Sequence, residues 1–155
     1  MNQSAATSRA FHAIFAAGSL CGVLDITAAF VTAYVTRGMK PGRLLQGIAS
    51  GLLGAKAFNG GWESAALGLA CHFFIAFAAA TVFYIASRQL TLMTRRPIFS
   101  GVLYGIAVYT VMYWIVVPFV FGPRPFNWNV TVVAIVTHIV CVGTPISLVV
   151  HRHST

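Results

Sequence analysis

Long apolar runs separated by short basic clusters dominate the sequence. Four of them, at residues 10–36, 62–87, 97–121 and 128–150, contain no charge apart from single acidic residues in the first two. A helix needs about 20 apolar residues to cross a bilayer, and each run reaches that length. The runs do not alternate as barrel strands do. The pattern therefore predicts four transmembrane helices.

A shorter apolar segment at residues 43–58 lies between the first two runs. Pro41 and Gly42, which favour a turn, precede it, and Asn59-Gly60-Gly61 interrupts the chain after it. The segment is too short to cross the bilayer, so we predict an interfacial or half-buried helix. The chain, residues 1–155, is then expected to be one all-α membrane domain, a bundle of four transmembrane helices.

The composition indicates that the main partner of the chain is lipid. Hydrophobic residues make up 58% of the chain and charged residues 8%, against about 25% charged residues in soluble domains. Such a chain must turn most of its surface toward lipid. The net charge of +8 would usually suggest nucleic acid, but here the basic residues flank the apolar runs, as is typical of residues that face lipid headgroups. We therefore expect a lipid bilayer and no nucleic acid as partner.

The basic residues do not decide the orientation in the membrane. Five lie on each side of the four predicted spans: Arg9, Arg88, Arg95, Arg96 and Arg152 on one side, and Arg37, Lys40, Arg43, Lys56 and Arg124 on the other. The positive-inside rule therefore gives a tie. The third connection, GPRPFNWN, is rich in proline and aromatic residues and carries one base, which favours the outer side. Both termini are then expected in the cytoplasm.

Small residues at helical spacing mark the sides on which the predicted helices pack. Helices in lipid associate through small residues and polar contacts, because lipid tails are as apolar as leucine. The GxxxG spacing therefore indicates helix packing rather than phosphate binding, and it leaves open a homo-oligomer or a larger membrane complex. The candidate packing residues are Gly18, Gly22, Gly47, Gly51, Gly68, Gly101 and Gly105.

Three polar residues share both a face and a depth in this arrangement. Asp25, His72 and His138 each lie on the small-residue side of their own helix, within about two residues, or 3 Å, of the middle of the span. Ionisable residues at this depth are costly and commonly mark functional sites. We therefore predict one polar intramembrane site formed by these three residues. Residues that could extend it are Cys21, Tyr109, Thr137 and Cys141.

Several hypotheses fit such a site. The leading one is a proton-linked transport element for a small solute or ion. In the second, the polar residues only fix helix register in a non-catalytic accessory or assembly subunit of a membrane complex. In the third, His72 and His138 hold b-haem, or the Asp, His and Cys side chains bind a transition metal, in a redox protein. No cofactor is predicted outright. No catalytic residue is assigned, because no hydrolase, P-loop, HExxH or CxxC motif is present.

Four stretches carry a resemblance to a known group of proteins. GVLDITAAFV, RLLQGIASGLLG, ALGLACHFFIAF and SGVLYGIAVYTVMYWIVVP resemble, in order and spacing, a group of short, uncharacterised bacterial inner-membrane proteins. The resemblance runs from about Gly18 to Pro118, and the fourth span is a looser match. It implies a bacterial inner-membrane location and four helices. It carries no activity, cofactor or catalytic residue.

Overall fold

The computed structural model describes residues 3–122 and 125–153 of the chain. Within these ranges the chain is helical and contains no strand. The segments are α1 (Gln3–Arg37), α2 (Pro41–Leu53), η1 (Gly54–Asn59), α3 (Gly61–Gln89), α4 (Thr91–Arg95), α5 (Pro97–Val111), η2 (Met112–Val116), α6 (Val117–Phe121), α7 (Trp128–Thr137), η3 (His138–Gly143) and α8 (Thr144–Arg152). The η1 segment is a 3₁₀-helix, whereas η2 and η3 are π-helical turns.

Four continuous helices are long and apolar enough to cross a membrane. They run over Thr7–Arg37, Gly61–Gln89, Pro97–Phe121 and Trp128–Arg152. The shortest of them would extend about 37 Å, more than the roughly 30 Å of a hydrocarbon core. The predicted fold, an all-α membrane protein with four spans and a shorter helix between the first and second, is confirmed.

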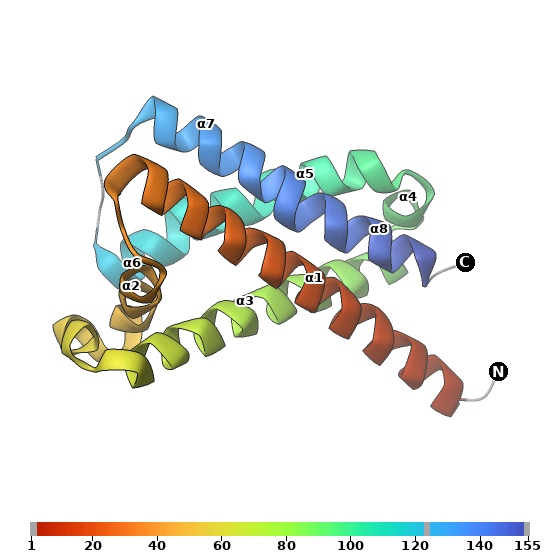
Figure 1. Cartoon of the computed structure of the whole chain (residues 1–155). Coiled ribbons are helices and arrows are strands. Elements are labelled where there is room, and N and C mark those ends of the chain that lie inside the picture. The colour runs from red at the N-terminus through yellow and green to blue at the C-terminus, as the bar shows by residue number, and fades with distance from the viewer. Residues whose placement is uncertain (1–2, 123–124, 154–155) are drawn as a thin grey trace.

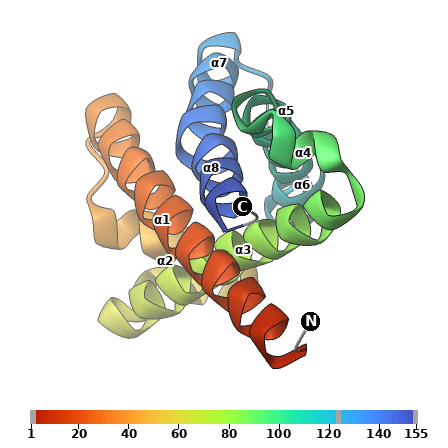
Figure 2. The same cartoon turned by 90° about the vertical axis from the view of Figure 1, so that its right-hand side faces the viewer.

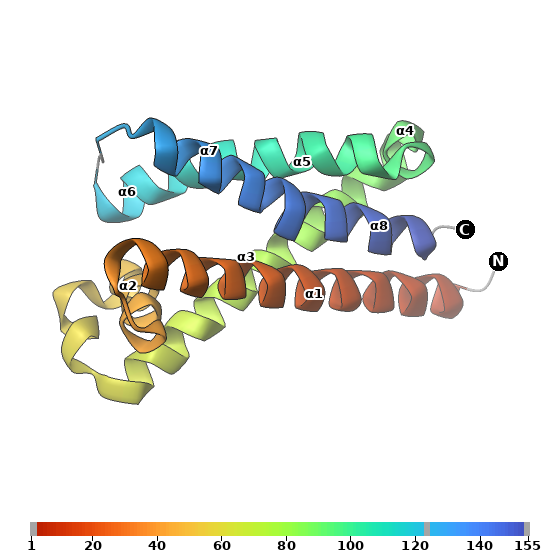
Figure 3. The same cartoon turned by 45° about the horizontal axis from the view of Figure 1, so that its top comes forward.

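The spans cross one another and leave the two ends of the chain together. Figure 1 shows the start of α1, the end of α8 and α4 at one end of the molecule, and α2 and α6 at the other. We call these the terminal end and the loop end. Figure 3 shows α8 between α5 and α1, with α3 crossing on a diagonal behind them. Figure 2, seen from the terminal end, shows the same crossing of α1 and α3.

The first span ends at Arg37, one residue beyond the predicted end, and Gly38 follows it. Gly38 has a φ of +62°, its N–H donates to the Tyr34 carbonyl over 2.8 Å, and the Met39 N–H bonds six residues back over 3.2 Å. The bond from the N–H of a left-handed glycine to the carbonyl four residues back is the pattern of an αL C-cap. Pro41 begins α2, where its missing N–H costs nothing, and Gly42 is helical. The prediction of a turn at Pro41-Gly42 was therefore wrong by a few residues.

The third and fourth spans meet backbone against backbone. A Cβ placed on Gly105 would lie 2.6 Å from Ile139 Cα, and one on Gly101 would lie 2.8 Å from Thr144 Cα. Gly143 faces both of these glycines from the fourth span. No side chain fits between the helices there, so this contact depends on glycine.

The glycines of the first span serve a different purpose. They make room for aromatic rings of α3: a Cβ on Gly22 would lie 2.7 Å from Phe73, and one on Gly18 would overlap Phe77. The rings of Phe73 and Phe77 lie 6.4 Å apart between their centroids. The first and second spans therefore pack through aromatic rings of α3 set against glycines of α1, rather than backbone against backbone.

The short helix α2 joins two spans at the loop end. Gly68 of α3 lies directly against the Leu45 backbone, and a Cβ on Gly51 would lie 2.7 Å from Val120 of α6. Gly47 lies on the other side of α2, where a Cβ would meet nothing within 4 Å. The packing expected of Gly47 is therefore not present, because α2 docks through the face that carries Leu45.

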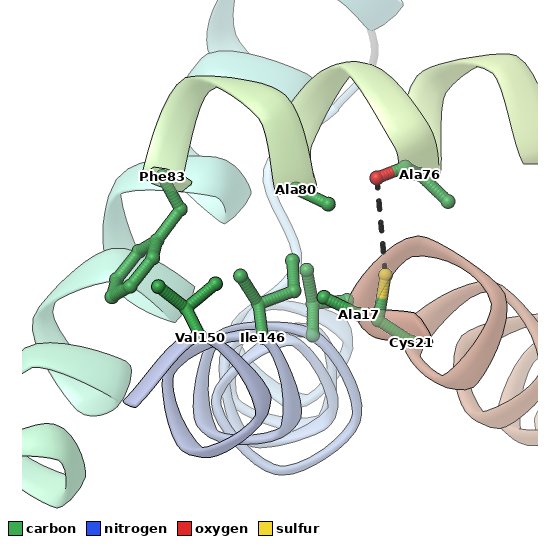
Figure 4. Packing of buried hydrophobic residues seen from close by; sticks show 8 residues of the cluster. Ala17, Cys21, Ala76, Ala80, Phe83, Ile146 and Val150 are labelled. Atoms are coloured by element: carbon green, nitrogen blue, oxygen red, sulfur yellow. Dashed lines mark hydrogen bonds between the residues drawn. The ribbon is translucent and has the colours of Figure 1, made fainter. Parts of the chain in front are cut away.

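The best-packed part of the bundle lies toward the terminal end, where α1, α3 and α8 meet (Figure 4). Phe83, Ile146 and Val150 have no exposed surface. The Cys21 thiol donates across the helices to the Ala76 carbonyl over 3.9 Å. The full cluster is Ala17, Cys21, Ala76, Ala80, Phe83, Val142, Ile146 and Val150. Small residues on α1 and α3 thus let larger side chains of α8 fill the centre.

Candidate functional site

A cavity of about 840 Å³ lies between α2, the middle of the bundle and the loop-end half of the third span. Its wall is almost entirely apolar. The residues that line it are Cys21, Asp25, Ile48, Gly51, Leu52, Ala70, Cys71, His72, Phe74, Ile75, Ala76, Ala79, Val108, Met112, Val116, Val117, Val120, Phe121, His138 and Val142. Asp25, His72 and His138 are thus on the wall of one cavity, although they come from three different spans.

Asp25 is the one charged residue on this wall. It is half-buried, on the third turn before the end of α1. Among the described residues no hydrogen bond or ion pair involves its carboxyl group. The carboxyl group therefore faces the cavity with its hydrogen-bonding capacity unused.

His72 reaches from α3 to the backbone of α1. Its Nε2 lies 2.9 Å from the carbonyl oxygen of Gly22, in the turn that precedes Asp25. A carbonyl oxygen can only accept, so Nε2 carries the hydrogen and donates. In the neutral ring Nδ1 is then a free acceptor. Phe73 packs edge-on against the ring, with centroids 5.6 Å apart.

His138 is held by its own helix at the first residue of η3. Its Nδ1 lies 2.8 Å from the Ala134 carbonyl oxygen, so Nδ1 donates and Nε2 of the neutral ring is left as an acceptor. The ring packs edge-on against Tyr109, with centroids 5.8 Å apart. Tyr109 is 4% exposed, and its hydroxyl has no hydrogen-bond partner among the described residues. An unpaired buried hydroxyl lowers stability, so its presence beside His138 calls for an explanation other than helix packing.

The structure brings the three polar residues to one cavity but not into direct contact. In the described part of the chain, no hydrogen bond joins Asp25 to His72 or His138, because each imidazole donates to a backbone carbonyl instead. A direct Asp–His relay is therefore absent from this arrangement. About one helical turn separates Asp25 from the carbonyl that His72 binds, a rise of about 4.5 Å. A ligand or water molecules in the cavity could bridge such a gap.

The predicted extensions of the site differ in position. Cys21 lines the cavity, and its thiol is engaged with the Gly18 and Ala76 carbonyls. Tyr109, Thr137 and Cys141 are not on the wall: Tyr109 is buried behind His138, and the other two are half-buried on the fourth span. Cys71, which sequence reasoning left unassigned, does line the cavity, next to His72 on α3.

The geometry bears on the cofactor hypotheses as well. No group of three or more His, Cys, Asp or Glu side chains in the described residues lies close enough to hold a metal ion. Zinc sites need three or four protein ligands. Haem between the two histidines would require His72 to release the Gly22 carbonyl to use its Nε2. The donor set therefore does not fit a metal or haem site as it stands.

Two π-helical turns border the cavity, one in each of the last two spans. The Val117 N–H bonds to the Met112 carbonyl and the Thr144 N–H to that of Ile139, each five residues back. Met112 and Val116 of η2 and His138 and Val142 of η3 supply wall residues. Such turns are rare and are frequent at functional sites.

The sequence carried a signal for these turns that periodicity alone did not reveal. Pro118 and Pro145 each follow a π-helical turn by two residues. A proline inside a helix has no N–H to donate and its ring crowds the carbonyl four residues back, so the preceding turn must adjust. A proline within an apolar run therefore indicates where a membrane helix departs from α-helical geometry.

Comparisons with protein-family models, with curated proteins and with solved structures found no match for this chain.

Proposed function

We propose that this multi-pass membrane protein is a small transport element of the bacterial inner membrane. It would bind a solute in the cavity of Asp25, His72 and His138 and couple its movement to protons. One observation supports this above all: a carboxyl group and two imidazoles from three spans border a single, largely apolar cavity. Ionisable groups inside a bundle are retained at a cost and commonly mark solute and proton pathways.

The shape of the site favours binding over a purely structural role. Polar residues that only fix helix register bond to one another or to the facing helix. His72 does so, through Gly22. Asp25 does not, since its carboxyl group has no partner in the described part of the chain. A carboxyl group kept on a cavity wall without a partner is explained by a ligand rather than by helix packing.

Proton flux into reconstituted vesicles tests this proposal. Vesicles loaded with a pH-sensitive dye and placed under a pH gradient receive a panel of small organic cations, anions and neutral solutes. We expect one class to accelerate the pH change through the wild-type protein and not through Asp25→Asn. Glu63→Gln is the matched control, because Glu63 is the other acidic residue and lies off the cavity wall, in the first turn of α3.

Two results would contradict transport. If every solute gives the flux of empty vesicles with the wild-type protein, the proposal is wrong. If Asp25→Asn transports as the wild type does, the cavity is not the pathway. Purification of the native protein with a stoichiometric partner subunit, together with the first result, would favour the accessory role.

A further inference from the structure

We propose that the cavity takes a lipophilic organic cation: an apolar body with a positively charged, preferably N–H-bearing, head group that sits between Asp25, His72 and His138. This rests on the proposed function in that it names the solute class of the same site. The charge and hydrogen-bonding character of the wall and the volume of the cavity support it.

The charge on the wall has one sign. Among the residues that the structure describes, 3–122 and 125–153, Asp25 is the one carboxyl group on the wall, and no lysine or arginine lines it. No described side chain forms an ion pair with it. An ionised carboxylate in an apolar, membrane-embedded setting is costly unless an opposite charge approaches. A bound cation supplies that charge, whereas an anion would add a second negative charge to it.

The polar groups on the wall are mainly hydrogen-bond acceptors. The N–H of neutral His72 goes to the Gly22 carbonyl and that of neutral His138 to the Ala134 carbonyl, which leaves two bare ring nitrogens as acceptors. The Cys21 thiol is likewise committed to backbone carbonyls. The wall thus offers acceptors from all three site residues and almost no donors. An ammonium group, which carries donors only, is complementary to it.

The rest of the wall fits an apolar body. A volume of about 840 Å³ lies in the range of pockets that enclose drug-sized molecules. Phe74 and Phe121 can face a positive charge with their rings, and Met112 adapts to irregular shapes. A small inorganic ion would leave most of this apolar space unfilled. The size therefore points to an organic cation rather than to a metal ion or a bare proton.

Two ions of the same shape and opposite charge test whether the cavity prefers a cation. Purified protein in detergent micelles is titrated with tetraphenylphosphonium and, separately, with tetraphenylborate, with empty micelles to correct for partition. We expect saturable binding of the phosphonium to wild type and Glu63→Gln, and no saturable binding of the borate. Asp25→Asn should weaken phosphonium binding at least about tenfold, and Asp25→Glu should restore part of it.

A second probe tests the acceptor nitrogens. Octylammonium carries N–H donors, whereas tetraphenylphosphonium carries none. His138→Phe, which keeps a ring at that position, should weaken octylammonium binding about tenfold and leave phosphonium binding unchanged. His12→Phe is the matched control, because His12 also bonds through Nδ1 to the carbonyl four residues back, at 2.6 Å from Ser8, but lies off the cavity wall.

The outcomes separate this inference from transport itself. Tighter binding of the borate, or unchanged phosphonium binding in a folded Asp25→Asn variant, overturns the cationic class even if another solute drives proton flux. Equal effects of His138→Phe on both probes overturn the role of the acceptor nitrogens. Saturable, Asp25-dependent phosphonium binding without flux would uphold the ligand class and contradict transport.

Discussion

The two ends of the bundle are built from the same spans but packed in opposite ways. At the terminal end, Phe83, Ile146 and Val150 are completely buried where α1, α3 and α8 meet. At the loop end, the same α3 borders a cavity of about 840 Å³, shared with α2 and α6. Tyr104 stands between the two, since its hydroxyl donates to the Ala79 carbonyl over 2.7 Å and its ring packs on Phe83.

This difference shows that close packing in the bundle depends on particular residues. Contact between helices in lipid brings no hydrophobic stabilisation, so a tight interface depends on complementary shape and small residues. The chain does this at one end and not at the other. The residues Cys21, Ala76 and Val142 belong both to the packed cluster and to the cavity wall, so the change occurs within about a helical turn. All three candidate site residues lie on the open side.

The largest contrast is expected from truncating two phenylalanines of α3, one in the packed cluster and one on the cavity wall. Phe83→Ala should lower the free energy of unfolding by about 3 kcal/mol or more, because it empties a fully buried site. Phe74→Ala, at a ring that is 74% exposed, should change it by less than about 1 kcal/mol. Unfolding by SDS titration in mixed micelles measures both. Equal losses would mean that the two ends are packed alike.

A methyl group on glycine tests the backbone contact of the last two spans. Gly105→Ala should destabilise the protein by about 2 kcal/mol, because its Cβ would lie 2.6 Å from Ile139 Cα. Gly47→Ala should instead stabilise it by about 0.5 kcal/mol, since the new Cβ meets open space and alanine favours the helix. The same unfolding assay compares them, and a tolerated Gly105→Ala would contradict the close approach.

Replacing alanines of α3 with leucine locates the boundary between the packed cluster and the cavity. Ala80 is fully buried in the packed cluster, whereas Ala70 is exposed on the cavity wall. Ala80→Leu should cost about 1–2 kcal/mol through overpacking, and Ala70→Leu less than about 0.5 kcal/mol. The second variant narrows the cavity, so it should also weaken phosphonium binding. Stability unaffected by both changes would argue against a tightly packed core.

The smallest effect is expected from the hydrogen bond at the boundary. Tyr104→Phe removes the donor to the Ala79 carbonyl and should cost about 0.6 kcal/mol, the average for such bonds between membrane helices. Tyr34→Phe, at a side chain that is 64% exposed at the end of α1, serves as the reference and should be neutral. A larger loss for Tyr34 than for Tyr104 would contradict the assignment.

The sequence was sufficient to predict the spans because an apolar stretch of some 25 residues with almost no charge is typical of a transmembrane helix. The helical spacing of small residues also indicated sides on which the helices pack, such as that of Gly101 and Gly105, which meet the backbone of the fourth span. That Asp25, His72 and His138 act as one site stays a prediction. The cavity itself could not be foreseen, since its volume depends on how far the spans diverge. The partners of His72 and His138 could not be foreseen either, because backbone carbonyls leave no mark in the residue pattern.

The number of residues in the π-helical turn η3 affects how the fourth span faces the cavity and the core. Its Thr144 N–H bonds five residues back rather than four, so the turn holds one residue more than an α-helix would, and every side chain beyond it is rotated by about 100°. His138 on the cavity wall and Ile146 and Val150 in the core on α8 are thereby brought to one side of the span. Deleting one residue from this turn would restore an α-helical turn and keep that alignment, because the extra residue is the one that the π-helical turn absorbs. The fourth span thus carries one additional residue beside the cavity without a change in the side that it turns to the bundle.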